Sequence, residues 1–223
     1  MTRAVVADVA TFVSNTLYSL ATFPGASGAA WPSEFATTTG SPAGSVTQDG
    51  AGFGLMQANN ASAWNGSQPT ARLTTVSSVG LDLTVRVRLP GTGTGTPLQF
   101  WPGIGIGITS DAGGNGYFTS GYTLQIAAAN NTWSLLTSAG ASLSGDVAQT
   151  WQANTDYMVR IVRAAGLIQA RTWLASAAQP TTWGYSGAAS VTTAGTIGFL
   201  TGQGGDTTAR PVRFNGITLT DGT

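Results

Sequence analysis

The chain has 223 residues, a formal net charge of zero and only 8% charged residues, and it contains no lysine, histidine or cysteine. These absences exclude an imidazole base, a Schiff-base lysine and a thiolate nucleophile, and also metal sites built from thiolate or imidazole ligands. The scattered arginines give no basic patch, so we expect no nucleic-acid partner. No apolar run approaches the ~20 residues of a membrane span, so we expect no membrane insertion.

The N-terminal segment, residues 1–30, permits two structures. Its apolar residues between Val9 and Leu20 fit either a first strand or a short helix, so the segment is a first strand or a short attachment element. The stretch from Met1 to Asp8 carries one basic residue and no long apolar core, which is not the pattern of a secretory signal. We therefore expect a protein that acts inside the cell that makes it or leaves by another route.

Alternation with a period of two dominates the rest of the chain. Apolar and polar residues alternate from Leu81 to Leu89, which predicts a half-buried strand that ends at Pro90. After a Gly/Thr loop, the isoleucines of residues 103–108 face one side of a second strand and the glycines face the other. Further strands are predicted at about 45–57, 121–128, 131–137, 156–163, 167–174, 195–201 and 211–220. Many strands without helical spacers indicate an all-β sandwich or jelly roll.

The C-terminal third adds short patterns in a fixed order. They are a strand ending in Arg171-x-Trp173, a Pro180-x-x-Trp183 turn, a Gly195-x-x-Gly198 strand and a closing Val212-x-Phe214 strand. This order resembles the concanavalin A-like, laminin G-like jelly-roll domains, as found in minor tail or tail-fibre proteins of actinobacteriophages. The resemblance implies an all-β fold, a concanavalin A-like jelly-roll β-sandwich of two antiparallel sheets, over residues 31–223. It also implies that Trp173, Pro180 and Trp183 belong to the scaffold.

The chain departs from the glycosidases of this superfamily. Those enzymes carry two glutamates and an aspartate on one strand, whereas the only glutamate here is Glu34, which has no acidic partner nearby. A retaining glycosidase needs two carboxylates ~5–5.5 Å apart, so we expect a binding protein and not an enzyme. Aspartates from distant strands could still meet, which leaves an enzyme with an unorthodox aspartate site as one alternative.

The predicted glycine face at residues 103–107 is one candidate glycan site. Gln99 and Trp101 share its parity, so Trp101 would supply a flat apolar surface beside a shallow trough, while polar groups would pair with sugar hydroxyls. Alternatively, the glycines make room for bulky neighbours on adjacent strands, and Trp101 packs over them.

Arg86 and Arg88 lie on the polar side of the preceding strand, and we expect them to line the same face together with Gln125. Arginine suits the carboxylates or sulfates of acidic glycans because its planar fork binds them through two hydrogen bonds. Their alternative role is a solvent-facing one, in ion pairs with Asp82 or in a subunit contact.

Loop positions supply the remaining candidates. Trp64 and Tyr117 lie in loop-like segments, where exposed aromatic residues anchor a glycan or contact another subunit. Several jelly rolls of the superfamily bind calcium near the chain ends, and the resemblance makes Asp8 and Asp221 the candidate ligands here. Calcium needs ~6–8 oxygen ligands, and no other cofactor is expected.

These observations together favour a virion surface protein of a bacteriophage, of the minor tail or tail-fibre type. It would be assembled in the host cytoplasm and released by lysis, and its jelly roll would bind a host-surface glycan or dock onto other virion proteins. By analogy with such appendages we expect a homo-oligomer, a trimer. The alternative is an extracellular carbohydrate-binding module of a secreted bacterial enzyme or adhesin.

Overall fold

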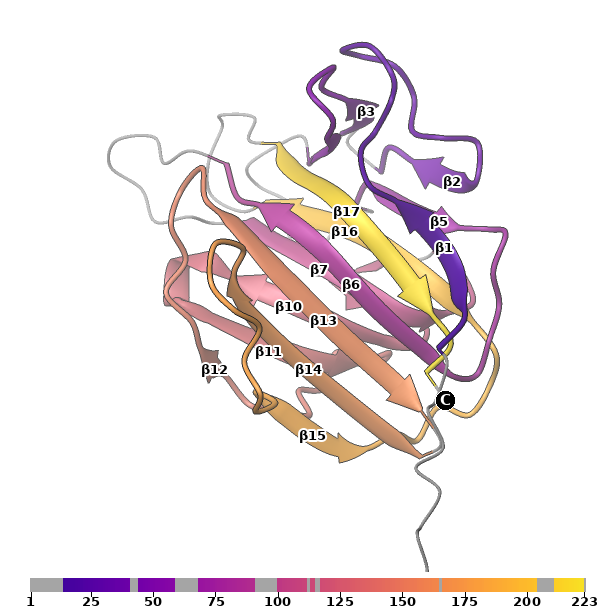
Figure 1. Ribbon diagram of the computed structural model, residues 1–223, viewed down its shortest axis with the longest axis vertical. Coiled ribbons are helices and arrows are strands. Elements are labelled where there is room, and N and C mark those ends of the chain that lie inside the picture. The colour runs from indigo at the N-terminus through magenta and orange to yellow at the C-terminus, as the bar shows by residue number, and fades with distance from the viewer. Residues whose placement is uncertain are drawn as a thin grey trace, which may run out of the picture.

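The computed structural model describes residues 14–40, 44–58, 68–90, 100–111, 113–114, 117–164, 166–203 and 211–222. Three proposed ligand residues, Asp8, Trp64 and Gln99, lie outside these ranges. The described residues form two antiparallel sheets packed face to face (Figure 1). They contain a short 3₁₀ helix, Ala128–Asn130, and no helix that is long and apolar enough to cross a membrane.

The first sheet has eight strands. Its order is β15 (Tyr185–Ala188), β14 (Leu167–Leu174), β13 (Asp156–Ala164), β6 (Leu81–Arg88), β17 (Val212–Thr220), β4 (Gly54–Gln57) and β3 (Ser45–Gln48), with β1 (Thr16–Leu20) paired to β17. The second sheet has seven strands, in the order β12 (Val147–Ala148), β11 (Thr132–Thr137), β10 (Tyr122–Ala127), β7 (Phe100–Ile108), β16 (Thr196–Gln203), β5 (Thr70–Leu73) and β2 (Phe35–Thr38). A separate hairpin consists of β8 (Gly113–Gly114) and β9 (Tyr117–Phe118).

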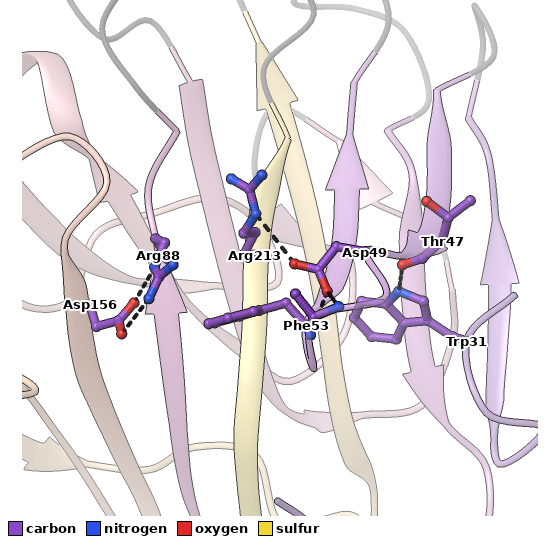
Figure 2. Close-up of polar contacts among 8 residues, drawn as sticks. Trp31, Thr47, Asp49, Phe53, Arg88, Asp156 and Arg213 are labelled. Atoms are coloured by element: carbon purple, nitrogen blue, oxygen red, sulfur yellow. Dashed lines mark hydrogen bonds and ion pairs between the residues drawn. The ribbon is translucent and has the colours of Figure 1, made fainter. Parts of the chain in front are cut away.

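The core lies between the two sheets, since alternate residues of each strand point inward. Leu83 and Val85 of β6 are fully buried, as are Ile104 of β7 and Leu124 of β10 in the opposite sheet. An aromatic cluster, in which Trp31 packs against Phe23, Phe35, Phe199 and Phe214, is part of this core. The Trp31 indole N–H donates to the Thr47 carbonyl at 2.7 Å, which ties the cluster to β3 (Figure 2).

The all-β class with two antiparallel sheets is confirmed, and the strands predicted after residue 120 have nearly the predicted bounds. The single strand expected at 45–57 is wrong. A turn divides it into β3 and β4 because the Asp49 carboxylate accepts hydrogen bonds from the backbone N–H groups of Ala51 (2.7 Å) and Phe53 (2.9 Å).

The N-terminal segment joins the sandwich. Residues 16–20 form β1, so the helical alternative is wrong there, and residues 8–13 lie outside the described part. Phe23 is 2% exposed and packs on Trp31 in the core. Within the described residues 14–30, β1 thus extends the eight-stranded sheet and Phe23 contributes to the core.

A backbone irregularity in β7 redirects one side chain to the outer face of the seven-stranded sheet. Gly107 has a φ of 73°, and the register of β7 with β16 shifts beside it. Ile108 consequently leaves the main core and packs with Phe118 and Leu200 in a second buried cluster.

Candidate functional site

The described candidate residues lie on opposite faces of the sandwich. Arg86 and Arg88 alternate with buried residues of β6 and point outward from the eight-stranded sheet. Gln125 of β10 is paired with Gly103 of β7 and points outward from the seven-stranded sheet. The prediction that these residues line one face is wrong, because β6 and β7 follow each other in sequence but belong to different sheets.

The glycine face of β7 is filled where the structure describes it. Gly105 is paired with Gly198 of β16, and a Cβ atom at either position would lie 2.6–2.7 Å from the Phe118 ring. Phe118 is fully buried and belongs to the hairpin that covers this face. The glycines here make room for a bulky neighbour, as the alternative interpretation expects.

Trp101 and Gln125 do share a face, the outer side of the seven-stranded sheet. Trp101 is paired with Gly202, and both Trp101 and Gln125 are half-buried. Tyr117 packs against Gly140, since a Cβ there would lie 2.7 Å from the tyrosine ring. The roles of these residues in glycan binding stay predictions.

The outer face of the eight-stranded sheet carries several ion pairs. Arg88 binds both carboxylate oxygens of Asp156, at 2.6 and 2.9 Å, and the Phe53 ring lies 4.6 Å from the Arg88 guanidinium carbon (Figure 2). Arg213 lies 3.6 Å from the Asp49 carboxylate. The hydrogen bond from Arg88 to Asp156 raises the pKa of Arg88.

A second pair lies further along the same face. Arg160 donates to both oxygens of Asp82, at 2.9 and 2.5 Å, and these hydrogen bonds raise the pKa of Arg160. Pairing with Asp82 was foreseen from the sequence for Arg86 and Arg88, but the register places Arg160 of β13 there. Asp82 is therefore paired with an arginine of the neighbouring strand β13.

The segment of residues 175–184 lies over this face. It starts at Ala175, whose N–H donates to the Asp156 carbonyl at 2.9 Å. The Gln179 amide oxygen, suitably oriented, accepts from Arg160 at 2.9 Å and from Arg171 at 3.2 Å. Arg171 also donates to the Pro180 carbonyl, and its guanidinium carbon lies 4.0 Å from the Trp183 ring centre.

A pocket of about 190 Å³ opens beside this stack, at the side of the sandwich. The edge strand β15 pairs with only the first half of β14, so the second half of β14 faces the edge strand β12 of the other sheet (Figure 1). The pocket is lined by residues of both sheets and of the 175–184 segment: Trp133, Val147, Ala148, Gln149, Arg171, Thr172, Pro180, Thr182, Trp183 and Gly184. Burial lowers the pKa of Arg171, but an arginine stays cationic at neutral pH.

The walls of this pocket combine aromatic and polar groups. The Trp183 indole supplies apolar surface, whereas the Trp133 indole belongs to the buried core and is only 1% exposed. The Thr172 hydroxyl donates to the Gln149 side-chain oxygen at 3.1 Å. Apolar walls with a few fixed polar groups are typical of sites for small polar ligands. Sequence reasoning assigned Trp183 to the scaffold and missed Gln149, because only the fold brings the end of β12 and the residue after it next to the Pro-x-x-Trp turn.

The described residues do not supply a calcium site at Asp221. Both of its carboxylate oxygens accept hydrogen bonds from Asn15, at 2.8 Å from the backbone N–H and 3.0 Å from the side-chain amide. No group of three or more acidic residues gathers in the described ranges. A calcium ion there would need ligands from elsewhere, and Asp8 lies outside the described residues.

Comparison with solved structures identifies the class of fold. The carbohydrate-binding module CBM66 from Bacillus subtilis is similar with a TM-score of 0.56 and 9% identity, covering 84% of this chain and 96% of that one. The VIP36 exoplasmic/lumenal domain, in a form bound to Ca²⁺ and mannose, is similar with a TM-score of 0.62 and 11% identity, and the match covers 90% of this chain and 88% of that one. The Emp47p carbohydrate recognition domain is similar with a TM-score of 0.58 and 12% identity, and the match covers 94% of this chain and 97% of that one. The chain has the jelly-roll fold of these lectin-like domains.

A scan against protein-family models gives no match, and a sequence search of curated proteins gives none either. At identities of 9–12% the structural likeness establishes the fold and no more.

Proposed function

We propose that this chain is a carbohydrate-binding domain and that the pocket beside Trp183 holds a sugar unit. The observation that carries the proposal is the pocket itself, in which the Trp183 indole meets the Gln149–Thr172 pair and the Arg171 guanidinium. A sugar ring offers an apolar C–H face to an indole and hydroxyl groups to amide, hydroxyl and guanidinium side chains. At about 190 Å³ the pocket suits one monosaccharide unit of a longer chain.

Two further observations support this proposal. The similar structures include a carbohydrate-binding module and a lectin domain bound to mannose. On the described outer face of the eight-stranded sheet, Asp82 and Asp156 are each held by an arginine through both oxygens, which suits a structural role better than acid–base chemistry. We therefore propose binding without catalysis.

The test is a glycan-array screen of the full chain, followed by calorimetry with the best glycan on three variants. Trp183→Ala and Gln149→Ala each remove a pocket wall and should weaken binding by about tenfold or more. Trp101→Ala removes the aromatic residue that the sequence favours on the opposite face, and should leave affinity unchanged. The proposal fails if Trp101→Ala abolishes binding while folded Trp183→Ala retains it.

A virion surface role, with a homotrimer and other virion proteins as partners, is the second candidate. The supporting observation is the low charge together with exposed apolar side chains at Leu167 and Leu174, which are 38% and 37% exposed at the two ends of β14. A neighbouring subunit would cover them. Light scattering that gives three chains per particle supports this candidate, and a monomer at all concentrations contradicts it.

Calcium binding through Asp221 and Asp8 is a separate proposal, supported by the calcium-bound form of the VIP36 domain. Thermal unfolding in millimolar calcium and in a chelator tests it, because an ion bound only to the folded chain raises the melting temperature. An unchanged melting temperature contradicts it.

A further inference from the structure

Arg86 occupies an unusual position on the outer face of the eight-stranded sheet. It lies in the middle of the central strand β6, between Met158 of β13 and Asn215 of β17. Its Nε atom is buried and has no hydrogen-bond partner. A buried guanidinium nitrogen without an acceptor is costly, so such an atom is expected to meet an acceptor that binds from outside.

The carboxylates on this face are already paired with arginines other than Arg86. Asp156, the carboxylate that lines the same pocket as Arg86, gives both oxygens to Arg88. Asp82 is paired with Arg160, and Asp49 with Arg213. Among the described residues no carboxylate pairs with Arg86, so its positive charge is uncompensated and this part of the face attracts an anion.

A pocket of about 440 Å³ adjoins Arg86. Its other walls are Asn154, Thr155, Asp156, Ala175 and Ser176. The turn at Asn154 is fixed by a hydrogen bond from its N–H to the Leu89 carbonyl, at 3.1 Å, and the Ala175 N–H holds the opposite wall to Asp156. The volume falls in the range of small-ligand sites, and the side chains of Asn154 and Ser176 can bond hydroxyl groups.

We propose that this pocket binds an acidic sugar unit, whose carboxylate pairs with Arg86 while its hydroxyls meet Asn154 and Ser176. The proposal rests on the proposed function and narrows it to glycans that contain uronic acid or a similarly placed anionic group. A planar carboxylate matches the guanidinium fork. Residues 175–176 form a wall of this pocket and residues 180–184 line the pocket beside Trp183, so a single segment contributes to both sites.

The experiment follows the arginine Nε–H signals of the full chain by NMR during titration with sodium glucuronate, glucose and sodium acetate at constant ionic strength. We expect glucuronate to shift the Arg86 signal saturably, with about tenfold higher affinity than acetate, and glucose to leave it unchanged. Arg86→Gln should abolish the glucuronate response. Arg213→Gln, which changes an ion-paired arginine of the same face, should preserve it.

Equal shifts with acetate and glucuronate would overturn the proposal, because they show a general anion site. No shift of Arg86 with glucuronate would also overturn it. Trp183→Ala separates this site from the proposed function. If Trp183→Ala abolishes binding of a neutral glycan and Arg86 does not respond to glucuronate, the proposed function stands and the acidic site falls. If Arg86 responds and no glycan depends on Trp183, the acidic site stands and the sugar site beside Trp183 falls.

Discussion

Arg171 and Trp183 stack with the guanidinium carbon 4.0 Å from the indole centre, and this contact joins the 175–184 segment to β14. Arg171 also donates to the Pro180 carbonyl. Arg171→Met removes both interactions and should lower the free energy of unfolding by about 1–3 kcal/mol. Because the pocket wall then loosens, glycan affinity should fall as well. Urea denaturation and calorimetry measure the two effects.

The control is Arg72→Met on the opposite sheet, where Arg72 is ion-paired with Asp111 and partly exposed. A partly exposed pair contributes about 1 kcal/mol or less, and glycan binding should not change. If the Arg72 variant loses glycan affinity as much as the Arg171 variant, the pocket beside Trp183 is not the site.

Arg163 stabilises one end of the sandwich from within. It is 1% exposed and donates to the carbonyls of Val79 (2.8 Å), Ser78 (2.8 Å) and Thr193 (3.0 Å). Arg163→Met removes the donor of all three hydrogen bonds from a buried position and should cost about 2–4 kcal/mol in denaturant unfolding. Arg163→Lys keeps a donor and should cost less. Equal stability of wild type and Arg163→Met would show that water replaces the guanidinium without loss.

The packing of Phe118 over the glycines can be tested by a double-mutant cycle. Gly105→Ala brings a methyl group within 2.6 Å of the Phe118 ring and should destabilise the fold by about 1–3 kcal/mol. In a Phe118→Ala background the same change should cost clearly less, because the ring is gone. Additive costs would mean that the glycine face is open in solution.

Tyr18 provides a test at high pH. Burial, together with the nearby Glu34 carboxylate, raises the pKa of Tyr18 to about 12. Since the folded state favours the protonated phenol, the stability it contributes is complete below about pH 10 and is lost as the pH rises towards 12. Tyr18→Phe should therefore flatten the fall in unfolding free energy over this interval. The difference in tyrosinate absorbance between wild type and Tyr18→Phe isolates this titration among the five tyrosines, and a Tyr18 pKa near 10 would contradict the assigned environment.

Sequence reasoning predicted the long strands because each buries one face, and alternation from Leu81 to Leu89 leaves no other structure. The short strands β2, β5 and β15 were not predicted, since four residues carry too little pattern. The sequence also could not predict which strands belong to which of the two sheets. Alternation tells which residues share a strand face, but not which of two outer faces that is.

This limit explains which residues of the candidate sites were predicted from the sequence and which were missed. Arg86 was identified as a binding residue from its place on a polar strand face, and the structure gives it a pocket. Trp183 was assigned to the scaffold, and it does stack on Arg171, but it also lines a pocket with Gln149. Gln149 directly follows β12, an edge strand of the other sheet, and no local pattern connects it to a turn more than thirty residues away.

The most direct test of glycan binding beside Trp183 is the indole N–H spectrum of the seven tryptophans during titration with the glycan selected on the array. The indoles of Trp31 and Trp151 donate to backbone carbonyls at 2.7 and 2.9 Å and serve as buried references. Binding as proposed shifts the Trp183 signal saturably and leaves those references in place. A glycan that shifts Trp101 or Trp64 and leaves Trp183 unchanged would contradict the site.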